Sequence, residues 1–103
     1  MDDLDSIEVS AYLSTEAMLE QTAEEATELA QACLKMARKS RGENPTPKTY
    51  SECIENLNEE IADVMLCLNI LIDQYIVLSH ESIESVIIEK EKRFKERLLE
   101  KGE

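Results

Sequence analysis

Two short groups of acidic residues have the spacing that a cation site requires. Glu25 and Glu28 stand three residues apart and follow Glu24, and Glu60 and Asp63 form a second pair with the same spacing. Residues three apart on a helix share a face, so each pair projects two carboxylates in one direction. No Lys or Arg lies within four positions of either pair, so no local salt bridge relieves the repulsion. Two facing helices would bring the four carboxylates together, and hard oxygen ligands of this kind favour Mg²⁺ or Mn²⁺.

Other interpretations of these acids are open at this point. Most Glu side chains on helices are solvated, and an acidic helix contains such spacings by chance. A di-iron bundle would need a histidine three residues after a glutamate. The single histidine, His80, lies beyond the second acidic group at a predicted helix start, where an exposed first-turn residue is expected.

The first acidic group lies on a predicted helix that begins with a cap at Ser14 or Thr15 and has no Gly or Pro before Gly42. Apolar and small residues recur mostly every three or four positions, which predicts its buried face: Leu19, Ala23, Ala26, Leu29, Cys33, Met36 and Ala37. Cations near its end suit the negative end of a helix dipole: Lys35, Arg38, Lys39 and Arg41. Residues 1–13 are expected to be a flexible arm or a short helix, and residues 41–47 a loop.

The second acidic group lies on a helix predicted to begin at a capping box formed by Thr49 and Glu52 and to end near Tyr75. Its apolar residues alternate spacings of three and four, which predicts a bundle seam: Ile54, Leu57, Ile61, Val64, Leu68, Leu71 and Tyr75. In this interpretation Glu60 and Asp63 flank the seam, because each precedes a seam residue.

This second helix is apolar on nearly all sides over part of its length. Between Val64 and Ile72 only Asn69 is polar. Such a helix must be covered on more than one side, and a chain of 103 residues has few elements to do so. We therefore expect a homodimer or a homotetramer. The predicted fold is one all-α domain over residues 1–103, with two long antiparallel helices and a C-terminal helix completed by oligomerisation.

The last predicted helix is capped by Ser79 and runs to Gly102, with a local excess of positive charge. Residues 89–101 contain six Lys or Arg against four Glu. Lys90, Arg93 and Arg97 are spaced three and four apart and share a face, so they are candidate phosphate ligands. Compensation of the helix dipole and salt bridges with neighbouring Glu are the alternative.

The whole chain is acidic, with 23 Asp and Glu against 11 Lys and Arg and a net charge of −12. This charge repels a phosphate backbone, so neither a nucleic-acid polymer nor an anionic membrane is an expected partner. Two Gly, two Pro and four aromatic residues argue against a small all-β domain. Three cysteines without a CxxC pair, and a start without the pattern of a signal peptide, lead us to expect a cytoplasmic protein.

The two acidic groups together resemble the signature of the MazG-like nucleoside triphosphate pyrophosphohydrolases, an all-α class. The family's EExxE corresponds to EEATE at residues 24–28, and its ExxD to EIAD at residues 60–63. The segment EKEKRFKERL resembles the family's basic closing segment, so the resemblance covers about residues 16–98. The stretch between the two motifs is slightly longer than usual, which a longer loop and an extra helical turn can absorb.

The resemblance implies hydrolysis of a nucleoside triphosphate between the α- and β-phosphates, giving the monophosphate and pyrophosphate. Mg²⁺, or Mn²⁺, would be held by Glu25, Glu28, Glu60 and Asp63, and Glu24 or a carboxylate not fully used as a ligand would activate water. Lys90, Arg93 and Arg97 would bind phosphates. A phosphoribosyl-ATP pyrophosphohydrolase, a dedicated deoxynucleotide pyrophosphatase and a non-catalytic acidic oligomerisation module are the alternatives.

Overall fold

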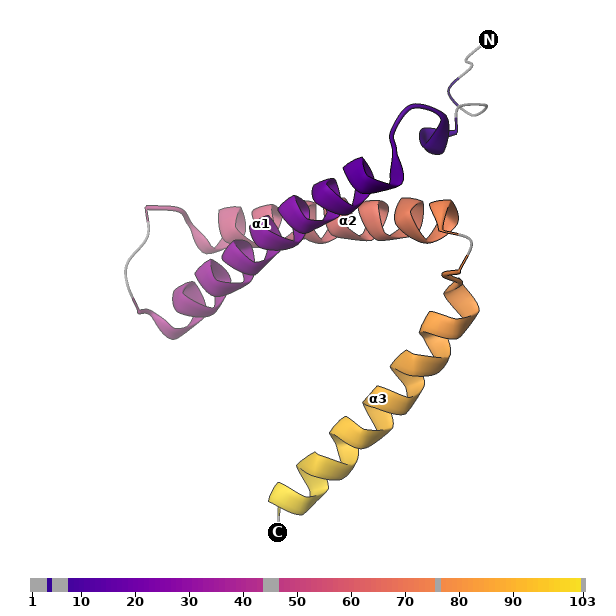
Figure 1. Ribbon diagram of the computed structural model, residues 1–103. Coiled ribbons are helices and arrows are strands. Elements are labelled where there is room, and N and C mark those ends of the chain that lie inside the picture. The colour runs from indigo at the N-terminus through magenta and orange to yellow at the C-terminus, as the bar shows by residue number, and fades with distance from the viewer. Residues whose placement is uncertain (1–3, 5–7, 44–46, 76, 103) are drawn as a thin grey trace.

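The computed structural model describes residues 4, 8–43, 47–75 and 77–102. A short 3-10 turn, η2 (Val9–Ala11), precedes three α-helices, α1 (Thr15–Arg41), α2 (Tyr50–Gln74) and α3 (His80–Lys101) (Figure 1). Within these ranges every regular element is helical, which confirms the prediction of an all-α chain. Of residues 1–13, η2 is a short helical turn, whereas residues 1–3 and 5–7 lie outside the described part.

The helix boundaries follow the capping residues that the sequence indicated. The Ser14 hydroxyl accepts a hydrogen bond from the Ala17 N–H at 3.0 Å and starts α1. Gly42 ends α1 in the left-handed conformation, with φ of 73°, where a residue with a Cβ atom would be strained. Thr49 and Glu52 form both hydrogen bonds of the predicted capping box at the start of α2. Ser79 caps α3 in the same way as Ser14 caps α1.

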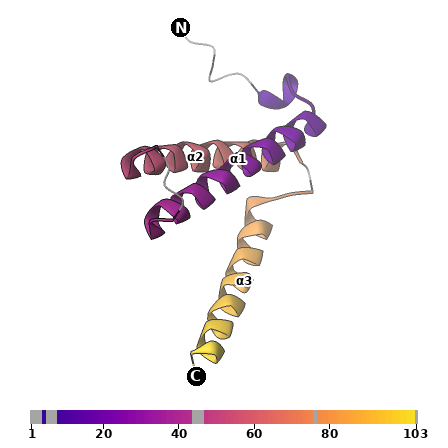
Figure 2. The same cartoon turned by 90° about the vertical axis from the view of Figure 1, so that its left-hand side faces the viewer.

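Helices α1 and α2 run in opposite directions and pack side by side as a hairpin (Figures 1 and 2). Their inward side chains are buried or half-buried and recur every three or four residues, which is the spacing of a helix–helix seam. On α1 these are Met18, Thr22, Glu25, Leu29, Ala32 and Met36. On α2 they are Cys53, Leu57, Glu60, Val64, Cys67 and Leu71.

The observed seam agrees with the predicted one at Leu57, Val64 and Leu71 of α2 and at Leu29 and Met36 of α1, but at the other positions the preceding residue faces inward. On α2 the predicted seam residues Ile54, Ile61 and Leu68 are 43%, 41% and 42% exposed, and Cys53, Glu60 and Cys67 face α1 instead. On α1 the predicted residues Leu19, Ala23, Ala26 and Cys33 are likewise exposed. On each helix, two adjacent faces have side chains at the same spacing. One of them includes a glutamate, Glu25 or Glu60, and the other is apolar throughout. Apolar character alone therefore predicts the second face, whereas the first one packs in the structure.

Helix α3 extends away from the hairpin in both views (Figures 1 and 2). Its predicted bounds are confirmed, but apart from the half-buried Ile83 its larger apolar residues, Val86, Ile87, Phe94 and Leu98 among them, are exposed. The radius of gyration is 18.0 Å, whereas a compact chain of this length has about 13 Å. The buried apolar residues of the described part are Met18, Ala32, Met36, Cys53 and Cys67. The core of one chain is therefore small and confined to the hairpin.

Among the residues that the structure describes, no helix combines the length and the apolar character that crossing a lipid bilayer requires.

Candidate metal centre

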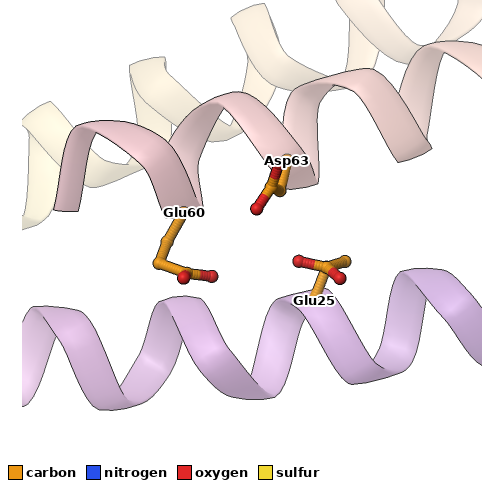
Figure 3. A group of neighbouring side chains, drawn as sticks. All are labelled: Glu25, Glu60 and Asp63. Atoms are coloured by element: carbon orange, nitrogen blue, oxygen red, sulfur yellow. The ribbon is translucent and has the colours of Figure 1, made fainter. Parts of the chain in front are cut away.

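Three carboxylates meet halfway along the hairpin. Glu25 occupies an inward position of α1 between Thr22 and Leu29, and Glu60 occupies the equivalent position of α2. Asp63 lies one helical turn after Glu60, toward one side of the seam. Figure 3 shows the three side chains converging on the space between the two helices. The packing of α1 on α2 therefore forces together the two acidic groups that are far apart in the sequence.

The geometry of this acidic triad, Glu25, Glu60 and Asp63, suits a divalent cation. One oxygen from each carboxylate lies within 4.8 Å of the other two. Glu25 and Glu60 are half-buried, and Asp63 is exposed, so the cluster is open to solvent on the side of Asp63. Mg²⁺ and Mn²⁺ are typically held by a few carboxylate oxygens and retain open positions for water or phosphate.

The electrostatics of the triad are unfavourable without a cation. The Oε2 atoms of Glu25 and Glu60 are shielded from solvent and have no hydrogen-bond partner. Partial burial raises the pKa of Glu25 above its ordinary value, and the carboxylates of Glu28 and Asp63 raise it further. The Gln21 amide, which donates to Glu25 Oε1 at 2.9 Å, opposes this shift. Buried acceptors without donors cost free energy, and a bound cation would remove that cost.

Cys67, which was not among the site residues predicted from the sequence, forms part of the surroundings of the triad. It lies on α2 one turn after Asp63, at the next inward position, and is buried. Burial raises the pKa of the Cys67 thiol, and the nearby carboxylates of Glu25 and Asp63 raise it further. Among the described residues, the ligand atoms close enough to share a cation are the carboxylate oxygens of Glu25, Glu60 and Asp63, and the Cys67 sulfur is not one of them. The spacing of four residues between Asp63 and Cys67 is the feature of the sequence that could have predicted this proximity.

Of the predicted acidic residues, the structure brings together Glu25, Glu60 and Asp63. Glu28 lies outside the triad but is close enough to raise the pKa of Glu25, and it is exposed on the same side of the hairpin as Asp63. Glu24 is exposed on α1 and is not a member of the cluster. A role for Glu24 or Glu28 in proton transfer stays a prediction.

The predicted phosphate ligands Lys90, Arg93 and Arg97 lie on α3 and are exposed. Because α3 extends away from the hairpin, the fold of one chain does not bring them to the triad (Figure 1). Along α3 the nearest neighbours include opposite charges, as in the ion pair of Lys95 with Glu91 at 3.6 Å. This ion pair shows that a lysine of α3 pairs with a glutamate on the same helix, which is the alternative interpretation of Lys90, Arg93 and Arg97.

Comparison of the chain with models of protein families, with curated proteins and with solved structures gives no match in any of the three.

Proposed function

We propose that this chain is a Mg²⁺-dependent nucleoside triphosphate pyrophosphohydrolase of the MazG-like kind, able to use Mn²⁺ in place of Mg²⁺. The observation that carries the proposal is the convergence of Glu25, Glu60 and Asp63 between α1 and α2. These residues belong to the EExxE and ExxD motifs whose resemblance to the family suggested the activity. Two motifs that meet as one oxygen cluster are what a shared metal site requires.

The charge of the protein supports a polyphosphate substrate that arrives with a cation. A chain with a net charge of −12 repels a free triphosphate. A bound divalent cation would neutralise the triad, polarise phosphate oxygens and favour ionisation of a water molecule. The triad residues would hold the ion, while Glu28, exposed beside them, is suited to accept the proton of the attacking water. Water adds to phosphorus, the bond to the α–β bridging oxygen breaks, and pyrophosphate and the monophosphate leave.

The proposed active unit is a homodimer, or a homotetramer built from dimers, in the cytoplasm. Counting about 100° per residue from Glu25 and Glu60 puts the exposed apolar residues of both helices on the side of the hairpin opposite Asp63. On α2 this apolar face comprises the exposed Ile54, Ile61, Met65 and Leu68 and the half-buried Ile72. On α1 it comprises the exposed Leu19, Ala23, Ala26, Ala30 and Cys33 and the half-buried Ala37. A second hairpin packed there would complete a four-helix core and leave the triad open on the other side.

Association would also give the C-terminal part of α3 a role. Residues 89–101 carry six Lys or Arg against four Glu, whereas α2 carries six acidic residues and no Lys or Arg. This part of α3 in one copy is therefore suited to approach the hairpin of another. Mixing subunits that carry Glu60→Gln with subunits that carry Arg93→Ala tests such a shared site. Recovery of activity in the mixed oligomer supports it, and no recovery counts against it.

The enzymatic proposal is tested with a panel of ribo- and deoxynucleoside triphosphates and with separate detection of pyrophosphate and phosphate. We expect Mg²⁺-dependent release of pyrophosphate, and a loss on the order of 100-fold or more in Glu60→Gln and Asp63→Asn. Glu59→Gln is the matched control, because Glu59 is adjacent, exposed and outside the triad. Release of single phosphate, or full activity of the triad variants, would overturn the proposal.

The same panel separates the alternatives. A strong kinetic preference for phosphoribosyl-ATP or for one deoxynucleotide would identify a specialised enzyme on this scaffold. The exposed apolar face favours a second candidate, a non-catalytic oligomerisation module. That candidate predicts no hydrolysis of any triphosphate and no heat of Mg²⁺ binding in calorimetry.

A further inference from the structure

A second polar site lies at the end of the hairpin where α1 leads into α2. A pocket of about 230 Å³ opens there. Among the described residues, its walls come from the last turns of α1, from residues 47 and 48 and from the first turns of α2: Ala32, Lys35, Pro47, Lys48, Cys53 and Asn56. We refer to it as the lysine pocket. Neither the acidic motifs nor α3 contributes a residue to this lining.

The lysine pocket has the chemistry of an oxyanion site. Two of its six lining residues are lysines, Asn56 offers amide N–H donors, and no lining residue is acidic. The carboxylate of Glu52 lies close enough to Lys48 for an electrostatic interaction, which lowers the pKa of Glu52, and it also accepts the Thr49 N–H at 2.8 Å in the capping box. The whole chain has a net charge of −12, whereas the charged side chains that line this pocket are both positive.

The lysine pocket lies on the same side of the hairpin as the open side of the triad. Lys35 follows Glu28 by seven residues, and Asn56 precedes Asp63 by seven, so each pair shares a helix face. Two helical turns correspond to about 10 Å along the axis. The inward walls of the pocket, Ala32 and Cys53, are likewise seven residues from Glu25 and Glu60. One groove between α1 and α2 thus carries an acidic cluster followed by a basic pocket.

We propose that the lysine pocket binds the pyrophosphate end of the substrate through Lys35, Lys48 and Asn56. The assignment rests on the proposed function and makes it more specific, because it sets the direction of the substrate along the groove. The polyphosphate runs from the triad toward the α1–α2 connection, and the nucleoside lies on the opposite side of the triad. The leaving pyrophosphate is then held by two ammonium groups of the same chain.

The test compares the double variant Lys35→Gln/Lys48→Gln with the wild-type protein. Both lysines are exposed, so the variant is expected to keep the fold, which circular dichroism checks. Calorimetry with inorganic pyrophosphate in the presence of Mg²⁺ should give an affinity about tenfold or more weaker. Binding of Mg²⁺ alone should stay unchanged. The control Lys39→Gln/Lys92→Gln removes the same charge from positions outside the pocket lining and should bind pyrophosphate like the wild type.

The outcomes separate this proposal from the enzymatic one. If the wild type hydrolyses triphosphates but the double variant retains its pyrophosphate affinity, the lysine pocket is not the subsite and the enzymatic proposal stands. If the wild type hydrolyses nothing but the double variant alone loses pyrophosphate affinity, the anion site stands and the enzymatic proposal falls. An equal loss in the control variant would mean that net charge alone attracts pyrophosphate, which overturns the subsite. Should the double variant unfold, each single variant must show part of the loss.

Discussion

The ionised form of Glu25 is the form that binds a cation, but without a cation it destabilises the folded chain. Because burial and two neighbouring carboxylates raise its pKa in the folded chain, the folded state holds this proton more tightly than the unfolded state. The metal-free protein therefore loses stability as pH rises through the folded pKa of Glu25. We predict that Glu25→Gln raises the melting temperature of the metal-free protein at neutral pH, and that the gain shrinks as pH falls.

The measurement is thermal unfolding in the presence of a chelator across the acidic to neutral range. Glu24→Gln is the matched control, because it removes the same charge from an exposed neighbouring position and should change the melting temperature little. A Glu25→Gln protein that melts below the wild type at neutral pH would contradict the account of the triad as a repulsive cluster.

The raised pKa of Glu25 also determines how the affinity for Mg²⁺ should depend on pH. Protons compete with the cation for Glu25, so Mg²⁺ affinity should fall as pH is lowered through the raised pKa of this group. Mg²⁺ should raise the melting temperature of the wild type and have little effect on Glu25→Gln. Calorimetric titration at several pH values measures the first effect and thermal unfolding the second. Affinity that is independent of pH would contradict a role for Glu25 as a ligand.

The sequence alone identified the acidic residues of the triad but not their setting. The spacing within each motif correctly predicted carboxylates on one helix face, and the order of the motifs predicted that two helices would carry them. It did not predict that Glu25 and Glu60 occupy inward positions, because a glutamate at a seam position is disfavoured unless something else pairs with it. The sequence placed Lys35 among the cations that suit the end of the helix dipole, and it did not predict that Lys35 lines one pocket with Lys48 and Asn56.

At the scale of single helices, the capping box of α2 makes a testable contribution. The Thr49 hydroxyl accepts the Glu52 N–H at 3.1 Å, and Glu52 accepts the Thr49 N–H. We predict that Thr49→Ala lowers the free energy of unfolding by about 1 kcal/mol, measured by urea denaturation. Ser51→Ala is the control, because Ser51 is not part of the box. Equal stability of the two variants would contradict this contribution.

The pH dependence of this contribution has the opposite sign from that of Glu25. The hydrogen bonds from Thr49, with a smaller effect of Lys48, lower the pKa of Glu52 in the folded chain. Its stabilisation is therefore present above the unfolded pKa and is lost as pH falls through the lowered folded value. The difference in unfolding free energy between the wild type and Thr49→Ala should shrink in acid.

Helix ends were predictable from the sequence because their signals are local. Ser14, Thr49 and Ser79 cap helices through their own side chains, and Gly42 ends α1 through its own backbone. Which face of α2 packs against α1 was not predictable, because Cys53–Glu60–Cys67 and Ile54–Ile61–Leu68 have the same period on adjacent faces. Only contact with α1 decides between them.

At the scale of the whole molecule, the hairpin has two different sides, one polar around Asp63 and one apolar around Ile61. We predict that Ile61→Glu converts the proposed oligomer into a monomer, because it puts a charge at the centre of the apolar face. Sedimentation equilibrium at micromolar concentration measures the change, with Ile61→Leu as the control that keeps the face apolar. A wild-type protein that is itself monomeric would contradict the proposed assembly.

The course of the whole chain was predicted in part. Periodicity and capping predicted three helices in the observed order. The apolar stretch after Val64 predicted that one chain could not cover all of its apolar surface, which agrees with the small core. The direction of α3 does not follow from the sequence, because its apolar residues do not specify which surface they cover.

The proposed function requires a divalent cation bound between α1 and α2. The direct measurement is an anomalous diffraction map of crystals of the wild-type protein grown with Mn²⁺. We predict a peak among the carboxylates of Glu25, Glu60 and Asp63, at distances near the roughly 2.1 Å typical of Mg²⁺–oxygen bonds. A map without density between these three side chains, at a Mn²⁺ concentration that supports hydrolysis, would contradict it.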